Sequence, residues 1–94
     1  HQYSVRIAGD RDEAARQLAD AGVGSAVFYP LPIPLQPVYA ELGYGAAAIP
    51  TAVRLSREVL ALPVHPGLTE AELRQVADAV NALRLAAPLE LAAA

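Results

Sequence analysis

Three segments of the chain have the apolar pattern of β-strands. Residues 2–7 alternate between apolar and polar side chains, which predicts a strand with one buried face. Residues 59–63 are apolar throughout and end at a proline, as in a strand that is buried on both faces. Residues 25–29 are mainly apolar and lead into a proline-rich stretch, so we expect another strand there.

A helix is expected directly after the N-terminal strand. Asp10 is a favourable N-cap residue, and Glu13 three positions later completes a capping-box pattern. Helical spacing continues to about Ala21, and Gly22 follows at the position where helices often end in left-handed backbone. The predicted inner face consists of small and branched apolar side chains, namely Ala14, Leu18 and Ala21.

A second capping box, formed by Thr69 and Glu72, marks a helix in the C-terminal part of the chain. Its apolar residues recur at spacings of three and four, which places Leu73, Val76, Ala77, Val80 and Leu83 on one face. A further helix is expected from Pro50 to about Glu58, and a short one over 37–42. Each of these has proline in its first turn.

The predicted order is strand, helix, strand, loop, helix, helix, strand, helix. This order is typical of an α+β domain in which helices cover a small sheet of about three strands. The 94 residues suffice for one such domain with one modest core. We assign the domain to residues 1–87 and expect the alanine-rich residues 88–94 to be a frayed tail, or one added by cloning.

Residues 28–39 contain four of the eight prolines of the chain. Because proline fixes φ and lacks a backbone donor, we expect a semi-rigid, extended connection there. Tyr29 and Tyr39 flank the prolines, and tyrosine combines a flat apolar ring with one polar group. These two side chains either line a ligand or partner surface or anchor the loop onto the core, and composition does not separate the two alternatives.

Composition disfavours several classes of function. A net charge of −3 without a basic cluster makes nucleic acid and anionic membranes poor partners. We expect no membrane span, because no apolar run is long enough, and no signal peptide, because the N-terminus reads as a strand. The lack of cysteine fits a cytoplasmic location. Cysteine, methionine and lysine are all absent. The chain therefore has no thiol chemistry and cannot form a lysine Schiff base, and we expect it to be a piece of a longer protein.

The remaining candidates for chemistry favour structural roles. His65 has no partner at metal-ligand spacing and is expected to be a turn residue. Glu70 and Glu72 lie in a first helical turn, where they serve as a cap and as partners of the helix dipole. Arg54 and Arg57 could clamp an anion, but on an exposed helix they are more often solvated.

Five blocks of sequence, taken in order, resemble the C-terminal small domain of the DegT/StrS-type sugar aminotransferases, which are fold-type I enzymes. The blocks are residues 1–6 with 10–12, 22–23 leading to 29–32, 35–39, 55–63 and 64–70. Each block is short, and the specificity of the resemblance comes from their order and spacing over nearly the whole chain.

The resemblance implies a parent enzyme that uses pyridoxal phosphate to transfer an amino group to a nucleotide-linked keto sugar. It implies a homodimer, in which this domain packs against a large cofactor-binding domain and completes a cleft between subunits. Catalytic and cofactor-binding residues would lie in the large domain, so this chain alone is expected to be inert. Tyr29 and Gln36 are the positions of this chain expected to contact substrate.

Three positions depart from the family pattern. Phe28, Pro34 and Val53 stand where the family commonly has a histidine or tyrosine, a histidine and a glutamate. The departures imply either a different substrate pocket or a degenerate domain that acts as an interaction or scaffold module. A sugar dehydratase of the same family is a further alternative.

Overall fold

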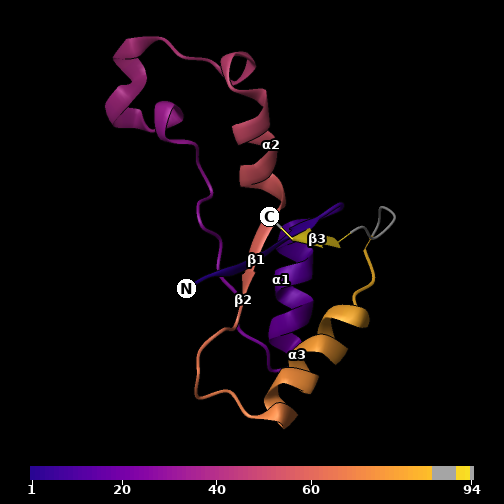
Figure 1. The fold of residues 1–94 in the computed structure, drawn as a ribbon. Helices are drawn as coiled ribbons and strands as arrows, with labels where there is room; N and C mark the ends of the chain where they lie inside the picture. Colours follow the sequence, from indigo (N-terminus) through magenta and orange to yellow (C-terminus); the bar gives the residue numbers. More distant parts are fainter. Residues whose placement is uncertain (86–90, 94) are drawn as a thin grey trace.

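The computed structural model describes residues 1–85 and 91–93 (Figure 1). The α-helices are α1 (Arg11–Asp20), α2 (Pro50–Glu58) and α3 (Glu70–Asn81), and the strands are β1 (Tyr3–Ile7), β2 (Val59–Leu62) and β3 (Leu91–Ala93). Three short 3-10 helices, η1 (Ile33–Leu35), η2 (Pro37–Leu42) and η3 (Ala46–Ala48), lie between α1 and α2. The fold is therefore of the α+β class, as the sequence predicted.

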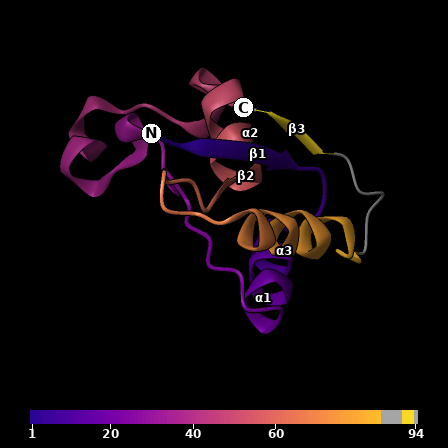
Figure 2. The same ribbon diagram turned by 60° about the horizontal axis from the view of Figure 1, so that its bottom comes forward.

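The sheet is antiparallel, and its strand order is β2-β1-β3. Along β1 and β2, Tyr3 lies opposite Leu62 and Val5 lies opposite Leu60. These four side chains share one face of the sheet because alternate residues of a strand point the same way. Helices α1 and α3 cover this face, whereas α2 and the 3-10 helices project away from the sheet (Figure 2).

The core lies between this face of the sheet and α1. Its members are buried apolar side chains from both strands, α1 and two connecting segments: Val5, Ile7, Ala14, Leu18, Val23, Leu60 and Leu83. The alternation in residues 2–7 and the continuous burial of Val59–Ala61 confirm the strand predictions for β1 and β2. Of the predicted inner face of α1, Ala14 and Leu18 are buried, but Ala21 lies beyond the last turn and is exposed.

The C-terminus of α1 is closed by a Schellman motif. Gly22 has a φ of 80°, and its amide donates to the carbonyl of Ala19 at 3.0 Å. The amide of Val23 donates to the carbonyl of Leu18 at 2.8 Å, and both of these side chains are buried. The left-handed stop predicted at Gly22 is therefore confirmed.

The strand predicted at residues 25–29 is wrong. Only Ala26 pairs, with Ala61, through two backbone hydrogen bonds of 2.8 and 3.1 Å. Gly24 precedes this bridge and Pro30 follows it, and neither residue favours a longer ladder. The sheet of about three strands is thus not confirmed in the form predicted. Within the predicted tail, Leu91–Ala93 pair with β1, and the rest of 88–94 lies outside the described residues.

The apolar face of α3 is only partly buried. Leu83, just beyond the helix, is buried, and Val76 and Val80 are half-buried. Leu73 is 53% exposed and Ala77 is exposed. These residues share one face, as predicted, but this face is only partly buried because the helix faces the sheet without closing onto it.

Residues 30–48, called the arm below, project from the body of the molecule (Figure 1). The radius of gyration is 15.1 Å, whereas a compact domain of this length has about 12 Å. The predicted extended connection is wrong in part, because Pro34 lies in the first turn of η1. Pro37 begins η2, as predicted for a short helix over 37–42. At these positions the fixed φ suits the turn and the missing donor is not needed.

Candidate functional site

The two side chains expected to contact substrate lie at the base of the arm and within it. Tyr29 is 69% exposed, and its ring packs edge to face on Phe28 with 5.6 Å between ring centroids. Its hydroxyl makes no hydrogen bond within the described part of the chain. Tyr29 therefore presents both its ring and its polar group outward, which is the geometry of a contact surface.

Gln36 connects the first two 3-10 helices of the arm. Its backbone amide donates to the carbonyl of Ile33 at 3.1 Å, and its own carbonyl accepts from the amide of Tyr39 at 2.9 Å. The residue has extended backbone, with ψ of 144°, as expected before Pro37. Its half-buried side chain makes no hydrogen bond to another described residue, so its amide group is available to a ligand.

No hydrogen bond joins Tyr29 to Gln36 in the described structure, and neither residue lines the two cavities described below. The three departures from the family pattern are also dispersed. Phe28 precedes the arm, Pro34 lies in η1, and Val53 lies on α2 beside a cavity. In this chain alone, Tyr29 and Gln36 therefore do not share a pocket.

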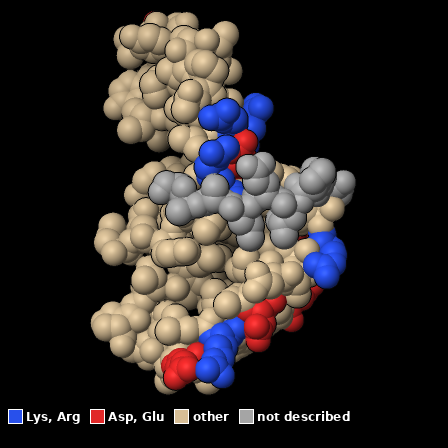
Figure 3. Space-filling view, turned by 45° about the vertical axis from the view of Figure 1, so that its right-hand side comes forward, with Lys and Arg blue, Asp and Glu red and all other residues tan. Residues whose placement is uncertain are grey.

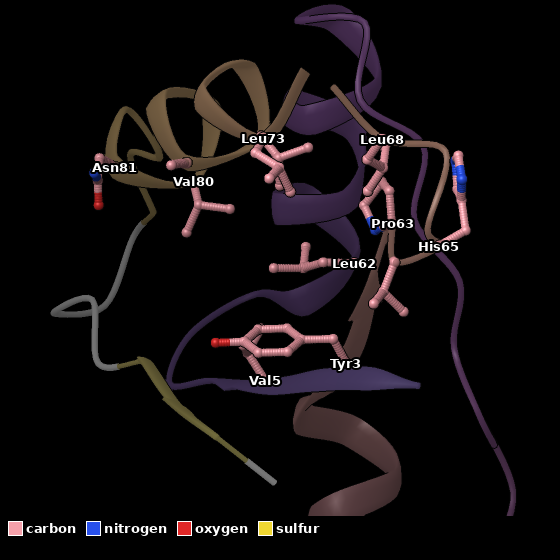
Figure 4. A pocket seen from close by; sticks show the side chains of 12 residues that line it. Tyr3, Val5, Leu62, Pro63, His65, Leu68, Leu73, Val80 and Asn81 are labelled. Carbon is pink, nitrogen blue, oxygen red and sulfur yellow. The ribbon is translucent and has the colours of Figure 1, made fainter. Parts of the chain in front are cut away.

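An apolar cavity of about 520 Å³ lies between the β1–β2 face and α3 (Figure 4). It is lined by aromatic and aliphatic side chains from both sides, chiefly Tyr3, Val5, Leu62, Leu68, Leu73 and Val80. It exists because α3 does not close onto the sheet. Sequence analysis did not predict this cavity, because the spacing of the apolar residues in α3 indicates a direction and not a depth of packing.

His65, at the edge of this cavity, is a turn residue. Its Nδ1 accepts a hydrogen bond from the amide of Gly67 at 3.1 Å. Among the described residues, no group of three side chains is arranged to hold a metal ion. The hydrogen bond with Gly67 confirms the prediction that His65 is a turn residue.

Both predicted capping residues accept the expected hydrogen bonds, but only the second box is complete. Thr69 Oγ1 accepts from the amide of Glu72 at 3.1 Å, and Glu72 accepts from the amide of Thr69 at 3.0 Å. These hydrogen bonds with Thr69 lower the pKa of Glu72. At the first box Asp10 accepts from the amide of Glu13. The Glu13 carboxylate binds Arg16 and Gln17 and does not accept a hydrogen bond from the backbone amide of Asp10.

Arg11 has a structural role that sequence analysis missed. Its side chain is only 10% exposed, and its Nη1 donates to the carbonyls of Ser56 at 3.0 Å and Val59 at 2.9 Å. It therefore holds the junction between α2 and β2 against α1. The available signal was its place in the block of residues 10–12 that resembles the family.

Comparison with known proteins shows which protein family this sequence matches. Residues 1–81 match the DegT/DnrJ/EryC1/StrS aminotransferase family. The erythromycin biosynthesis sensory transduction protein EryC1 of Saccharopolyspora erythraea is 44% identical over 82 residues, which are 87% of this chain and 21% of that protein. The dTDP-3-amino-3,4,6-trideoxy-alpha-D-glucose transaminase of Streptomyces venezuelae is 35% identical over 81 residues, or 86% of this chain and 21% of that protein.

The fold agrees with the sequence comparison. The crystal structure of S. venezuelae DesV in complex with a ketimine intermediate superposes with a TM-score of 0.80 at 35% identity. The match covers 85% of this chain and 21% of DesV, so the chain spans about a fifth of the length of the proteins that it matches. On its sequence over residues 1–81 and on its fold, this chain belongs to the DegT/DnrJ/EryC1/StrS aminotransferase family.

Proposed function

We propose that this chain is the C-terminal small domain of a pyridoxal-phosphate-dependent aminotransferase that acts on a nucleotide-linked keto sugar. The observation that carries the proposal is the match of residues 1–81, in order and fold, to about a fifth of sugar aminotransferases. In the parent protein the domain would pack on a large domain and complete a cleft at the boundary with a second subunit. Tyr29 and Gln36 are proposed to contact the sugar.

The residues of this chain do not fit the cofactor by themselves. Pyridoxal phosphate is held in such enzymes through a lysine side chain, and this chain has no lysine. We therefore propose that the chain is inert alone and supplies substrate contacts and domain packing. Mixed with pyridoxal phosphate, glutamate and a nucleotide-linked keto sugar, the 94-residue chain should form no amino sugar. Formation of that product would contradict the proposal.

A chimeric enzyme tests the positive part of the proposal. Residues 1–81 of this chain would replace the matching segment of the S. venezuelae transaminase, which is 35% identical. We expect the chimera to form the amino sugar. We also expect Tyr29→Phe in the chimera to raise the KM for the sugar, because this change removes the exposed hydroxyl. Tyr44→Phe is the matched control, since Tyr44 is also exposed.

A non-catalytic interaction module is the second candidate. It is favoured by Phe28, Pro34 and Val53, which put two apolar side chains and a proline where the family commonly has polar ones. A folded chimera that binds pyridoxal phosphate but does not turn over, and that regains activity on Pro34→His, would support this candidate over the first.

A further inference from the structure

A second cavity lies on the side of the molecule away from α3, between α2, the end of β1 and the arm. One face of α2 lines it, because its lining residues Pro50, Val53, Arg54, Arg57 and Glu58 recur at helical spacing. Ile7, Gly9, Ala46 and Ala47 form the other walls. The volume is about 580 Å³, within the range of about 300–1,000 Å³ that is common for small-ligand sites.

The charges around this cavity are unbalanced. Arg54 and Arg57 are exposed, and neither forms an ion pair or hydrogen bond with its side chain in the described part of the chain. The one carboxylate that lines the cavity, that of Glu58, is already paired with Arg6, with 2.9 Å between Oε2 and Nε. Figure 3 shows basic side chains next to acidic atoms beneath the arm.

The other arginines of the chain are engaged. Arg6, Arg11, Arg16 and Arg74 each form an ion pair, and Arg84 donates to the carbonyl of Leu83 at 2.8 Å. Interaction with the helix dipole accounts for Arg57, which lies in the last turn of α2, but not for Arg54 in the middle. Two arginines one helical turn apart thus line one cavity in a protein whose net charge is −3.

We propose that this cavity binds a diphosphate or similar oxyanion through Arg54 and Arg57. A guanidinium presents parallel N–H donors that match the spacing of phosphate oxygens, and two of them suit a ligand with more than one negative charge. Gly9, Ala46 and Ala47 leave room because they carry no long side chain into the cavity. This inference concerns the chain itself and does not depend on the proposed function.

Titration of the 94-residue chain with inorganic pyrophosphate tests this site. At low ionic strength, ¹H–¹⁵N NMR should show saturable shifts of the Nε–Hε signals of Arg54 and Arg57 and of the amides of Gly9, Ala46 and Ala47. Arg54→Gln and Arg57→Gln should each weaken binding about tenfold, as expected for the loss of one charge-assisted contact. Arg74→Gln is the matched control, because it removes one exposed arginine from another helix.

Equal weakening by Arg74→Gln, or shifts spread evenly over all arginine side chains, would overturn the proposal in favour of nonspecific attraction. Thermal melting of each variant ensures that lost binding is not lost folding. A parallel titration with uridine diphosphate distinguishes the source of the anion. Equal affinity would support recognition of the diphosphate alone, and tighter binding would support a nucleotide in the same site. No binding of either compound would sink the inference.

Discussion

Single residues fix the ends of the helices, and Thr69 is the clearest case. Its hydroxyl accepts a hydrogen bond from the amide of Glu72, which otherwise lacks a partner in the first turn of α3. Thr69→Ala should lower the free energy of unfolding by about 1 kcal/mol. Urea denaturation measures this change, with Thr51→Ala as the control in the first turn of α2. Equal free energies of unfolding for the two variants would show that the Thr69 cap does not stabilise the fold.

Gly22 occupies backbone that a side chain disfavours. Its φ is 80°, and an added Cβ would lie 3.2 Å from Nε2 of Gln75. Gly22→Ala should therefore cost about 1 kcal/mol or more. Gly24 lacks a positive φ and has open space around its Cβ position, so Gly24→Ala should be nearly neutral in the same denaturation experiment.

Acid should weaken the fold partly through Glu13. Its hydrogen bonds with Arg16 and Gln17 lower the pKa of the Glu13 carboxyl from 4.5 to about 2. A lowered pKa stabilises the fold above pH 4.5, and this contribution is lost as the pH falls from 4.5 to about 2. Glu13→Gln should thus flatten the dependence of unfolding free energy on pH in that window, as measured by urea denaturation at a series of pH values. An unchanged slope would contradict this expectation.

At the scale of elements, sequence patterns correctly predicted those helices and strands that depend on residues close together in the chain. The alternation in 2–7 predicted β1, and the continuous apolar run predicted β2. The capping pattern at Thr69 predicted the start of α3. The wrong predictions concern features that depend on distant parts of the chain. Tertiary packing decides whether residues 25–29 pair beyond Ala26. It also decides how closely α3 approaches the sheet.

The candidate site was less predictable than the fold. Tyr29 and Gln36 came from the family resemblance, and the structure brings them to no common pocket. The second cavity, lined by Arg54 and Arg57, forms only where α2, β1 and the arm pack together. The spacing of residues in the sequence does not predict this packing.

Arg11 links three elements, so its removal should affect more than α1. Its guanidinium satisfies two carbonyls at the junction of α2 and β2. Arg11→Leu would leave both without this partner and should cost about 2 kcal/mol. Arg16→Leu is the control on the same helix, since Arg16 is exposed and pairs only with Glu13 and Asp20. Comparable losses in urea denaturation would refute a special role for Arg11.

At the scale of the whole molecule, the arm exposes several large apolar side chains. Tyr29, Ile33, Val38, Leu42 and Tyr44 are all exposed on or beside it. Such a surface is typical of an interface, so we expect the isolated chain to self-associate or to be only marginally stable.

Analytical ultracentrifugation measures the association directly. Replacing Ile33, Val38 and Leu42 together with serine should shift the chain toward monomer with little change in melting temperature, because these side chains are exposed. Val64→Ser, an exposed position outside the arm, should leave the association unchanged. A wild-type chain that stays a stable monomer at all concentrations would contradict this expectation.

The bridge between Ala26 and Ala61 has an evolutionary consequence. The chain leaves the body just after this bridge and returns through α2 into β2, so the excursion begins and ends beside one strand. We therefore expect substitutions in the arm to leave the register of β1 and β2 unchanged. Related domains could therefore acquire a new specificity through substitutions in residues 30–48 without a change in the rest of the fold.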